Sequence, residues 1–442
     1  MSPVVVRFAP SPTGLLHAGN YRTAVFAYLF AKHSGGTFIV RIEDTDAARS
    51  KPEYIASIFE MLAWLDLPAD ETYRQGEHRG RYRELLEKLV ADKAAYVSKE
   101  TPQAPGDREE VIRFKNPGGG ITFTDVIRGE ITTDVADLGD FIIARSFDEP
   151  VFHFAVVVDD ADEGVTHVVR GADHISNTAR QMLIQRALGL SAPRYAHLPL
   201  IFNGEHKKLS KRTGAKPLAA YRDMGVLPEA LLNYIALLGW NPGDNREYLS
   251  REELIKAFDL SRVQKGSAVF DEVKLLSVNQ YWMRQLSVDE YIAKGNLLAD
   301  DNEKLRKVVP LLKERAQTFE QAREMLSGEL SFLFRGPTLV RDQLLAKELG
   351  HPGMTKMALQ SLSEAIQALP ESVSSGAARE ALMPLGNAEE AKVKGGRGAV
   401  LWPLRYALSG QERSPDPFTI ISVIGPAEAA SRLAIALGIL EG

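Results

Sequence analysis

Two short stretches of the sequence carry side chains suited to binding phosphate groups. In the first, His17 and Gly19 follow two prolines and a glycine, between a β-branched run at 4–6 and a helical pattern at 21–32. This order predicts a strand, a turn and a helix N-terminus, where backbone N–H groups attract an anion. His17 would donate a hydrogen bond to a phosphate oxygen, and Gly19 would leave room for a flat ring against the backbone. Taken alone, such a histidine is more often structural, so the assignment needs a partner motif.

That partner is a basic loop at 206–214. It follows a strand predicted over 195–202 and an Asn203-Gly204 turn, and it places four lysine and arginine side chains within six residues. Such a cluster could stabilise the charge that a polyphosphate gains in a transition state. A basic run this short is usually a solvated face. Its ending, Ser-Lys-Arg-Thr-Gly at 210–214, favours phosphate binding instead.

A third set of residues is suited to an acidic substrate. Arg7 and Arg170 each follow an apolar strand pattern, so both guanidinium groups should emerge at strand ends. A guanidinium binds a carboxylate through two parallel hydrogen bonds, which a lysine cannot match. Glu43 opens the acidic segment 43–46 behind a strand predicted over 37–42, where ligands bind in open α/β sheets. The alternatives are surface ion pairs for the arginines and a solvated, helix-capping loop for the acidic segment.

The elements that position these residues alternate between strands and helices. Further strands are predicted over 151–158 and 165–170, helices over 79–90 and 177–188, and a capping box at 50–53. Between 96 and 148 the pattern changes to turns and short strands at 111–115, 121–124 and 141–145, which indicates an insertion. From Pro228 onwards the spacing is mostly helical, and residues 401–405 open a helix after a glycine-rich turn at 394–398. The predicted fold class is therefore α/β and multidomain.

The composition limits the class of protein. The chain has 442 residues, of which 45% are hydrophobic and 25% charged, which suits two to four packed domains. A net charge of −5 argues mildly against bulk RNA affinity, yet it allows a local basic face. The absence of cysteine excludes disulfides, thiolate zinc sites and cysteine nucleophiles. Without a signal-peptide pattern or a run long enough to span a membrane, a cytoplasmic protein with no membrane contact is expected.

Together, the His17 stretch and the basic loop resemble the HIGH and KMSKR signatures of class I aminoacyl-tRNA synthetases. The segments 7–14, 41–46 and 168–174 are similar to those of bacterial glutamyl-tRNA synthetases, and the resemblance runs through nearly the whole chain. It implies a Rossmann-like parallel-sheet catalytic domain (1–95 and 150–227), an α+β acceptor-binding insertion (96–149), a helical stem-contact domain (228–320) preceded by the KMSKR-like loop (203–214), and a helical anticodon-binding domain (321–442). Without the N-terminal match, the last third would be taken as a generic helical bundle.

The resemblance also implies site residues. The implied catalytic set is His17, Gly19, Lys208, Ser210, Lys211 and Arg212. The implied glutamate-binding set is Arg7, Ala9, Ser11, Glu43, Phe152 and Arg170. The implied ATP-binding set is Pro10, Thr13, Gly14, His17, Asn20, Asp173, His174, Leu209 and Lys211. Within the basic loop, Lys211 is expected to be the dominant cation.

Two positions depart from the family's pattern. Phe152 stands where a tyrosine is usual, and His153 stands where an asparagine often follows. Loss of the phenolic hydroxyl would remove one polar contact near the substrate. The region between 96 and 111 is also short, and in many relatives it carries zinc-binding cysteines, so no structural zinc is expected here.

The implied reaction is ATP-dependent activation of L-glutamate, with Mg²⁺ on the phosphates, followed by transfer to the 3′ end of glutamate tRNA. The expected protein is a monomer. The candidates to contact the anticodon are Arg397, Trp402 and Arg405, although Trp402 fits a core position as well.

Two alternative functions stay open. One is charging of glutamine tRNA with glutamate, as well as or instead of glutamate tRNA. The other is a paralogue that binds RNA without this catalysis.

Overall fold

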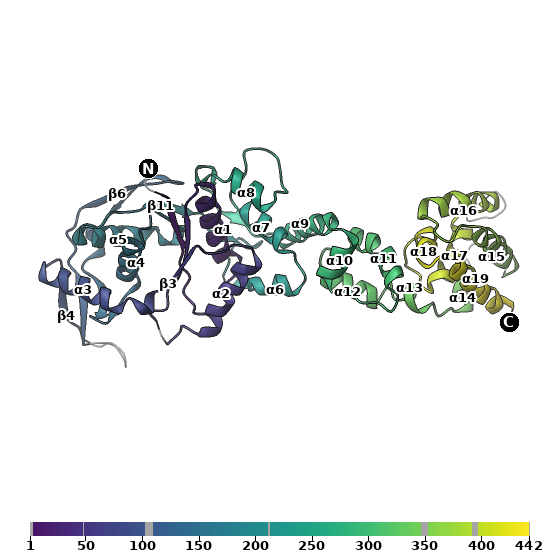
Figure 1. Cartoon of the computed structure of the whole chain (residues 1–442), viewed down its shortest axis with the longest axis horizontal. Coiled ribbons are helices and arrows are strands. Elements are labelled where there is room, and N and C mark those ends of the chain that lie inside the picture. Colours follow the sequence, from purple (N-terminus) through teal and green to yellow (C-terminus); the bar gives the residue numbers. More distant parts are fainter. Residues whose placement is uncertain are drawn as a thin grey trace. The chain divides into compact units, whose positions relative to one another are not determined.

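The computed structural model describes residues 3–46, 48–101, 109–210, 213–345, 352–390 and 397–441. The chain forms two compact units, Met1–Asn279 and Gln280–Gly442 (Figure 1). The helix α9 (Glu272–Gln285) contains the division between them.

A five-stranded parallel sheet lies at the centre of the first unit. Its strand order is β11-β10-β1-β2-β3, and all four strand pairs are parallel. The strands are β1 (Val5–Phe8), β2 (Thr37–Ile42), β3 (Glu71–Arg74), β10 (His167–Gly171) and β11 (Arg194–Leu198). The connecting helices are α1 (Ala18–His33), α2 (Pro52–Trp64), α4 (Phe152–Asp162) and α5 (Ile175–Leu188). Figure 1 shows α1 and α2 to one side of the sheet and α4 and α5 to the other. The predicted α/β class is confirmed.

The order of these strands places a topological switch point between β1 and β10. From β1 the chain proceeds to β2 and β3 on one side, and the later strands β10 and β11 add on the other side. Ligands of open α/β sheets bind at such a point, outside the carboxyl ends of the strands. Arg7 on β1 and Arg170 on β10 both lie near those ends.

The segment 151–158 was predicted to be a strand, and this prediction is wrong. It forms the helix α4, in which Phe154 through Val158 are almost completely buried. A run that is apolar on every side carries neither a two-residue nor a 3.6-residue period, so periodicity cannot separate a buried strand from a buried helix. The change matters because α4 carries two buried carboxylates, Asp159 and Asp160, and its C-cap residue is the buried Glu163.

The capping box predicted at 50–53 is also wrong. Pro52 occupies the first helical position, so Lys51 is the N-cap of α2. The lysine ammonium has no acceptor and makes no side-chain capping bond. Capping boxes form instead at the start of α1, between His17 and Asn20, and at the start of α8 (Arg251–Ala257).

The predicted insertion is built mainly of antiparallel strands. One sheet joins β4 (Ala95–Lys99), β5 (Glu110–Phe114), β8 (Phe141–Ser146) and β9 (Glu149–Pro150), and β6 (Gly120–Asp125) pairs with β7 (Gly129–Asp134). The three strands predicted in this region are confirmed. So is the preceding helix, α3 (Arg79–Ala91), which packs on β4. The tip of β6 packs against β11 of the central sheet.

Short elements complete the first unit. The strand predicted over 195–202 is two strands, β11 and β12 (Ile201–Phe202), because the chain leaves the sheet at Pro199. β12 pairs with β13 (Ala268–Val269). The remaining helices are α6 (Leu218–Asp223), α7 (Pro228–Ala236), α8 and the start of α9.

The described part of the second unit is helical, as predicted. Its helices are α10 (Val288–Gly295), α11 (Asn302–Arg315), α12 (Phe319–Ser327), α13 (Phe332–Arg335), α14 (Arg341–Leu344), α15 (Pro352–Gln367), α16 (Ser375–Glu390), α17 (Arg397–Ser409), α18 (Pro417–Ile424) and α19 (Pro426–Glu441). Of the turn predicted at 394–398, residues 394–396 lie outside the described residues. Arg397 and Gly398 belong to α17, which begins earlier than the predicted 401. Within the described ranges, no single helix meets the length and hydropathy needed to cross a membrane, and the pair α18 and α19, bent by 119°, meets them only jointly.

Candidate active site

Two cavities flank the turn between β1 and α1. A cavity of about 1110 Å³ is lined by Ser11, Thr13, Glu43 and Phe152, among others. A smaller one of about 440 Å³ is lined by Ala18, Leu209 and residues 213–216, at the end of the basic loop and just after it, among others. The residues expected to bind glutamate therefore line the first cavity in part, and the phosphate motifs line the second.

His17 is the N-cap of α1. Its ring Nδ1 accepts a hydrogen bond from the Gly19 backbone N–H at 3.1 Å, and the Asn20 side chain accepts one from the His17 backbone N–H at 3.2 Å. A neutral ring with an accepting Nδ1 carries its proton on Nε2, the nitrogen that could donate to a phosphate oxygen. A Cβ on residue 19 would lie 2.9 Å from the His17 ring, so the capping geometry itself requires glycine there.

The basic loop is anchored to this turn just after its end and to β12 at Leu209. Pro217, just after the loop, bridges to His17, and the Leu218 backbone N–H donates to the Leu16 carbonyl at 3.1 Å. Leu209 is buried and its N–H donates to the Ile201 carbonyl at 2.8 Å. The structure thus brings the two predicted phosphate motifs together.

Inside the loop, hydrogen bonds of Thr213 and an ion pair of Lys208 hold the backbone and link it to a neighbouring segment. The Thr213 hydroxyl donates to the Lys208 carbonyl at 2.6 Å and lies 3.1 Å from the Ser210 hydroxyl. The Lys208 ammonium pairs with Asp173 at 2.9 Å, which joins the loop to the segment after β10. Lys211 and Arg212 lie outside the described residues, so their roles stay predictions.

The loops that frame the larger cavity are held by backbone hydrogen bonds. The Glu43 N–H donates to the Pro10 carbonyl at 3.0 Å, and the Lys51 N–H donates to the Pro12 carbonyl at 3.2 Å. The segment 9–14 is thereby fixed against the acidic segment 43–46.

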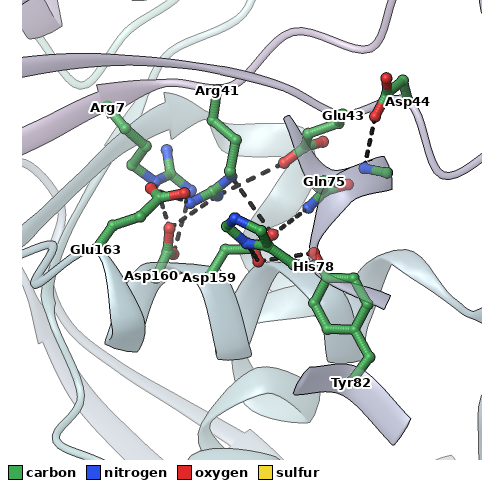
Figure 2. A network of polar contacts seen from close by, with 11 residues as sticks. Arg7, Arg41, Glu43, Asp44, Gln75, His78, Tyr82, Asp159, Asp160 and Glu163 are labelled. Atoms are coloured by element: carbon green, nitrogen blue, oxygen red, sulfur yellow. Dashed lines mark hydrogen bonds and ion pairs between the residues drawn. The ribbon is translucent and has the colours of Figure 1, made fainter. Parts of the chain in front are cut away.

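Arg7 and Arg41 lie in a buried network of charges (Figure 2). Glu43 belongs to this network and lines the larger cavity. Arg7 donates from Nε to Asp160 Oδ1 at 2.9 Å and from Nη2 to Asp160 Oδ2 at 3.4 Å. Arg41 is fully buried and lies 2.8 Å from Asp160, 2.7 Å from Glu163 and 3.7 Å from Glu43. Asp160 therefore occupies one edge of the Arg7 guanidinium and ties it to Arg41.

The network holds more carboxylates than guanidinium groups. Asp159 on α4 accepts hydrogen bonds from Gln75 at 2.7 Å and from the Tyr82 hydroxyl at 2.7 Å. With Glu43, Asp160 and Glu163, it makes four acids around two arginines. This excess favours a bound proton on part of the acid set.

Two of these acids titrate near neutrality. Burial raises the pKa of Glu43 to about 7, against the pull of Arg41 and Arg7. Burial likewise raises the pKa of Glu163 to about 7, opposed by Arg41 and helped by Asp159 and Asp160. Burial also opposes ionisation of Asp160, but Arg7 and Arg41 outweigh it and hold its pKa below the ordinary value.

Arg170 has a different environment from Arg7. Its Nε lies 3.2 Å from His197 Nε2, and its Nη2 donates to the Thr178 hydroxyl at 2.6 Å. The guanidinium lies 5.3 Å from the centre of the Tyr195 ring, and only 7% of the residue is exposed. Among the residues that the structure describes, no carboxylate pairs with it. Burial lowers the pKa of Arg170 to about 10, which still leaves a full charge at neutral pH.

Comparison with known proteins identifies the family. The family model "tRNA synthetases class I (E and Q), catalytic domain" matches residues 3–110 and 104–277, and the model "Anticodon binding domain" matches residues 278–437. The chain is 40% identical to glutamate–tRNA ligase 1 of Mesorhizobium japonicum over 98% of both chains, and 38% identical to glutamate–tRNA ligase of Geobacter sulfurreducens over the full length of both. The chain belongs to the glutamate–tRNA ligase family. The predicted resemblance to class I synthetases is therefore confirmed.

Solved structures of the glutamate–tRNA ligase family share the fold. A glutamate tRNA ligase from Elizabethkingia meningosepticum, solved in complex with its amino acid, aligns with a TM-score of 0.87 at 33% identity over 99% of both chains. Glutamate-tRNA synthetase from Elizabethkingia anophelis aligns with a TM-score of 0.83 at 33% identity over 99% of this chain and all of that one.

The departure at Phe152 leaves an aromatic cluster at the site. The Phe152 ring centre lies 5.6 Å from those of His153 and His174. Burial, with Arg180 and Arg170 nearby, lowers the pKa of His153 to about 4, and burial together with Arg170 lowers that of His174 to about 4. Both imidazoles are therefore neutral at physiological pH and add no competing charge beside Arg170.

Sequence reasoning missed the residues that hold the arginines in this glutamate–tRNA ligase family member. Asp160 and Glu163 hold Arg7 and Arg41, and His197 and Thr178 hold Arg170. One signal was available, since adjacent acids end the buried run at 159–160 and a histidine interrupts an apolar strand at 197.

The structure also bears on metal binding. Within the described residues, no group of three or more His, Asp or Glu side chains is arranged to hold a metal ion.

Proposed function

We propose that this chain activates L-glutamate with MgATP to form glutamyl-adenylate and then transfers the glutamyl group to the 3′ end of glutamate tRNA. The observation that carries the proposal is Arg170, a buried guanidinium without a carboxylate partner in the described part of the chain, at the switch point of the sheet. A buried cation is costly unless an anion completes the site. The side-chain carboxylate of glutamate would be that anion.

The contacts of the two arginines indicate which guanidinium is more available to the substrate carboxylate. Asp160 already accepts from Nε and Nη2 of Arg7, whereas the described contacts of Arg170 are all with neutral groups. Arg170 would therefore be the principal partner of the substrate side chain, and Arg7 a supporting one. Glu43 lines the larger cavity and would bind the substrate ammonium.

Catalysis in this proposal is positioning and charge stabilisation. The substrate α-carboxylate attacks the ATP α-phosphorus and pyrophosphate leaves. The Nε2–H of His17 and the ammonium of Lys208 would bind phosphate oxygens as negative charge grows on them, and Lys211 and Arg212 would act in the same way. In the second step, a terminal ribose hydroxyl of tRNA attacks the mixed anhydride, forming the ester and releasing AMP.

Residues 321–442 of the helical second unit would read the anticodon. Its match to an anticodon-binding domain supports this role, and Arg405 stacks at 4.7 Å over the half-buried Trp402 ring. A stacked arginine and an aromatic ring are suited to unstacked bases. The stem-contact region at 228–320, a monomeric state, a cytoplasmic location and the lack of structural zinc complete the proposal.

The test is aminoacylation of separated glutamate and glutamine tRNAs with labelled glutamate. The proposal expects rapid charging of glutamate tRNA, and an Arg170→Leu variant with a strongly raised glutamate KM. Arg194→Leu, an exposed arginine on β11, serves as the matched control and should behave as wild type. Equal charging of both tRNAs would favour the non-discriminating alternative, and RNA binding without charging would favour the non-catalytic one.

A further inference from the structure

Arg170 is held from behind by two buried residues of different segments. His197 on β11 is its direct partner in the parallel register of β10 and β11, and Asp125 ends β6 of the insertion. His197 is completely buried, and Asp125 is 1% exposed.

The hydrogen bonds between them fix the position of one proton. Asp125 Oδ2 lies 2.7 Å from His197 Nδ1 and accepts the His197 backbone N–H at 3.0 Å. A carboxylate only accepts, so Nδ1 must carry the ring proton and donate it. Nε2 is then an acceptor, and it faces Arg170 Nε at 3.2 Å, which can only donate.

The Asp125 carboxylate has no freedom to turn. Its Oδ1 accepts the backbone N–H groups of Ile127 and Arg128, both at 2.9 Å, so each oxygen has two donors. Burial opposes ionisation of Asp125, but hydrogen bonds from His197 and Arg128 outweigh it and hold its pKa below the ordinary value. For His197, burial lowers the pKa, against the pull of Asp125, and the ring stays neutral.

The ring is fixed as well as its proton. The His197 ring stacks on Tyr195, with ring centres 5.9 Å apart and an interplanar angle of 9°. It also packs against Phe123 in a T-shaped arrangement, with ring centres 6.1 Å apart. Thr178 completes the support, since its hydroxyl lies 3.0 Å from His197 Nε2 and accepts from Arg170 Nη2.

We infer that Asp125 and His197 are positioning residues of the glutamate side-chain site. Asp125 sets the tautomer of His197, and the neutral His197 ring sets the orientation of the Arg170 guanidinium. A carboxylate placed directly on Arg170 would orient it too, as Asp160 does for Arg7, but it would compete with the substrate for the guanidinium. The neutral imidazole holds Nε in place and leaves the positive charge to the ligand. This inference rests on the proposed function, because it assigns Arg170 to the substrate carboxylate.

The first test is Asp125→Asn. One orientation would place the amide N–H₂ against two backbone N–H donors, those of Ile127 and Arg128. In the other orientation the N–H₂ faces His197 Nδ1 and donates to it, which favours the tautomer whose Nε2–H points at Arg170. Loss of an oriented hydrogen bond to a charged group should raise the glutamate KM about 10- to 100-fold, while kcat changes by less than about threefold. Asp140→Asn is the matched control, since Asp140 in the same insertion accepts from the Asn116 N–H and the Tyr96 hydroxyl, away from Arg170.

The second test compares two changes at His197. His197→Leu removes the acceptor with a side chain of similar bulk, and His197→Gln keeps an oxygen that can accept from Arg170. The inference expects the glutamine variant to recover a substantial part of the glutamate KM and of the preference for glutamate over glutamine that the leucine variant loses. Calorimetric binding of glutamate to each purified variant, with its melting temperature, gives the same ranking without turnover.

Two results would overturn the inference while the proposed function stands. One is wild-type glutamate KM in Asp125→Asn and His197→Leu. The other is a fall of kcat with unchanged KM that follows the loss of folded protein, which is what a purely structural role predicts. If wild-type protein does not charge tRNA with glutamate at all, the proposed function itself has failed.

Discussion

Substitution of Asp160 by asparagine should destabilise the first unit far more than the same change two residues later. Asp160 is 6% exposed and contacts both buried arginines, at 2.9 Å for Arg7 and 2.8 Å for Arg41. Asn keeps the shape of Asp but removes the charge, and removal of one partner from a buried ion pair costs about 3–5 kcal/mol. Asp162, on the exposed side of α4, pairs with Arg81 at 3.0 Å, and such surface pairs contribute about 0–1 kcal/mol.

The assay is native-state hydrogen exchange of peptides from β1, β2 and α4, because a chain of two units need not unfold in one step. A loss of about 3 kcal/mol corresponds to exchange about 100-fold faster in Asp160→Asn, and Asp162→Asn should change it by less than about fivefold.

The destabilisation by Asp160→Asn should also depend on pH. Asp160 raises the pKa of Glu43 and Glu163, so its removal relieves repulsion when both are ionised. The loss should therefore be smaller at pH 8 than at pH 6. Equal exchange in the two variants would refute the view that Asp160 anchors the arginines.

Three further outcomes are expected. His17→Ala should lower the rate of adenylate formation about 10²- to 10³-fold, whereas His17→Asn should restore the helix cap but not the rate; full activity in the asparagine variant would show that His17 only caps α1. The glutamate KM should fall as pH rises through about 7, because Glu43 loses its proton there and can bind the ammonium, and Glu43→Gln should flatten this profile; an unchanged profile in the variant would assign the titration to another group. Metal analysis of dialysed protein should find no stoichiometric zinc, and about one zinc per chain would contradict that expectation.

The sequence predicted most of the central sheet because its strands are β-branched runs that end at turns. It failed at 151–158, where complete burial removes the period that separates a strand from a helix. It also failed at Ser50, where Pro52 shifts the N-cap of α2 by one residue. At 151–158 the buried environment decided the secondary structure, and at Ser50 one neighbouring residue, Pro52, decided where the helix begins. The average propensity of either segment did not decide it.

The site shows the same limit. His17 and Arg170 stand in segments with recognisable motifs, so their types and order were enough to propose chemistry. Their supporting partners were not recognisable in this way, because Asp160 lies 153 positions from Arg7 and Asp125 lies 72 positions from His197. Only the folded chain brings such pairs into contact, and burial, with Asp160 and Asp159 nearby, shifts the pKa of Glu43 towards neutrality.

The most direct test of the central claim is ATP-dependent attachment of each labelled amino acid, separately, to total tRNA by the full-length protein. The account predicts that glutamate is attached to RNA in a reaction that requires ATP, and that glutamine and aspartate are attached at least about 100-fold less efficiently. Preferential attachment of another amino acid, or no attachment by folded protein that still binds tRNA, would contradict it.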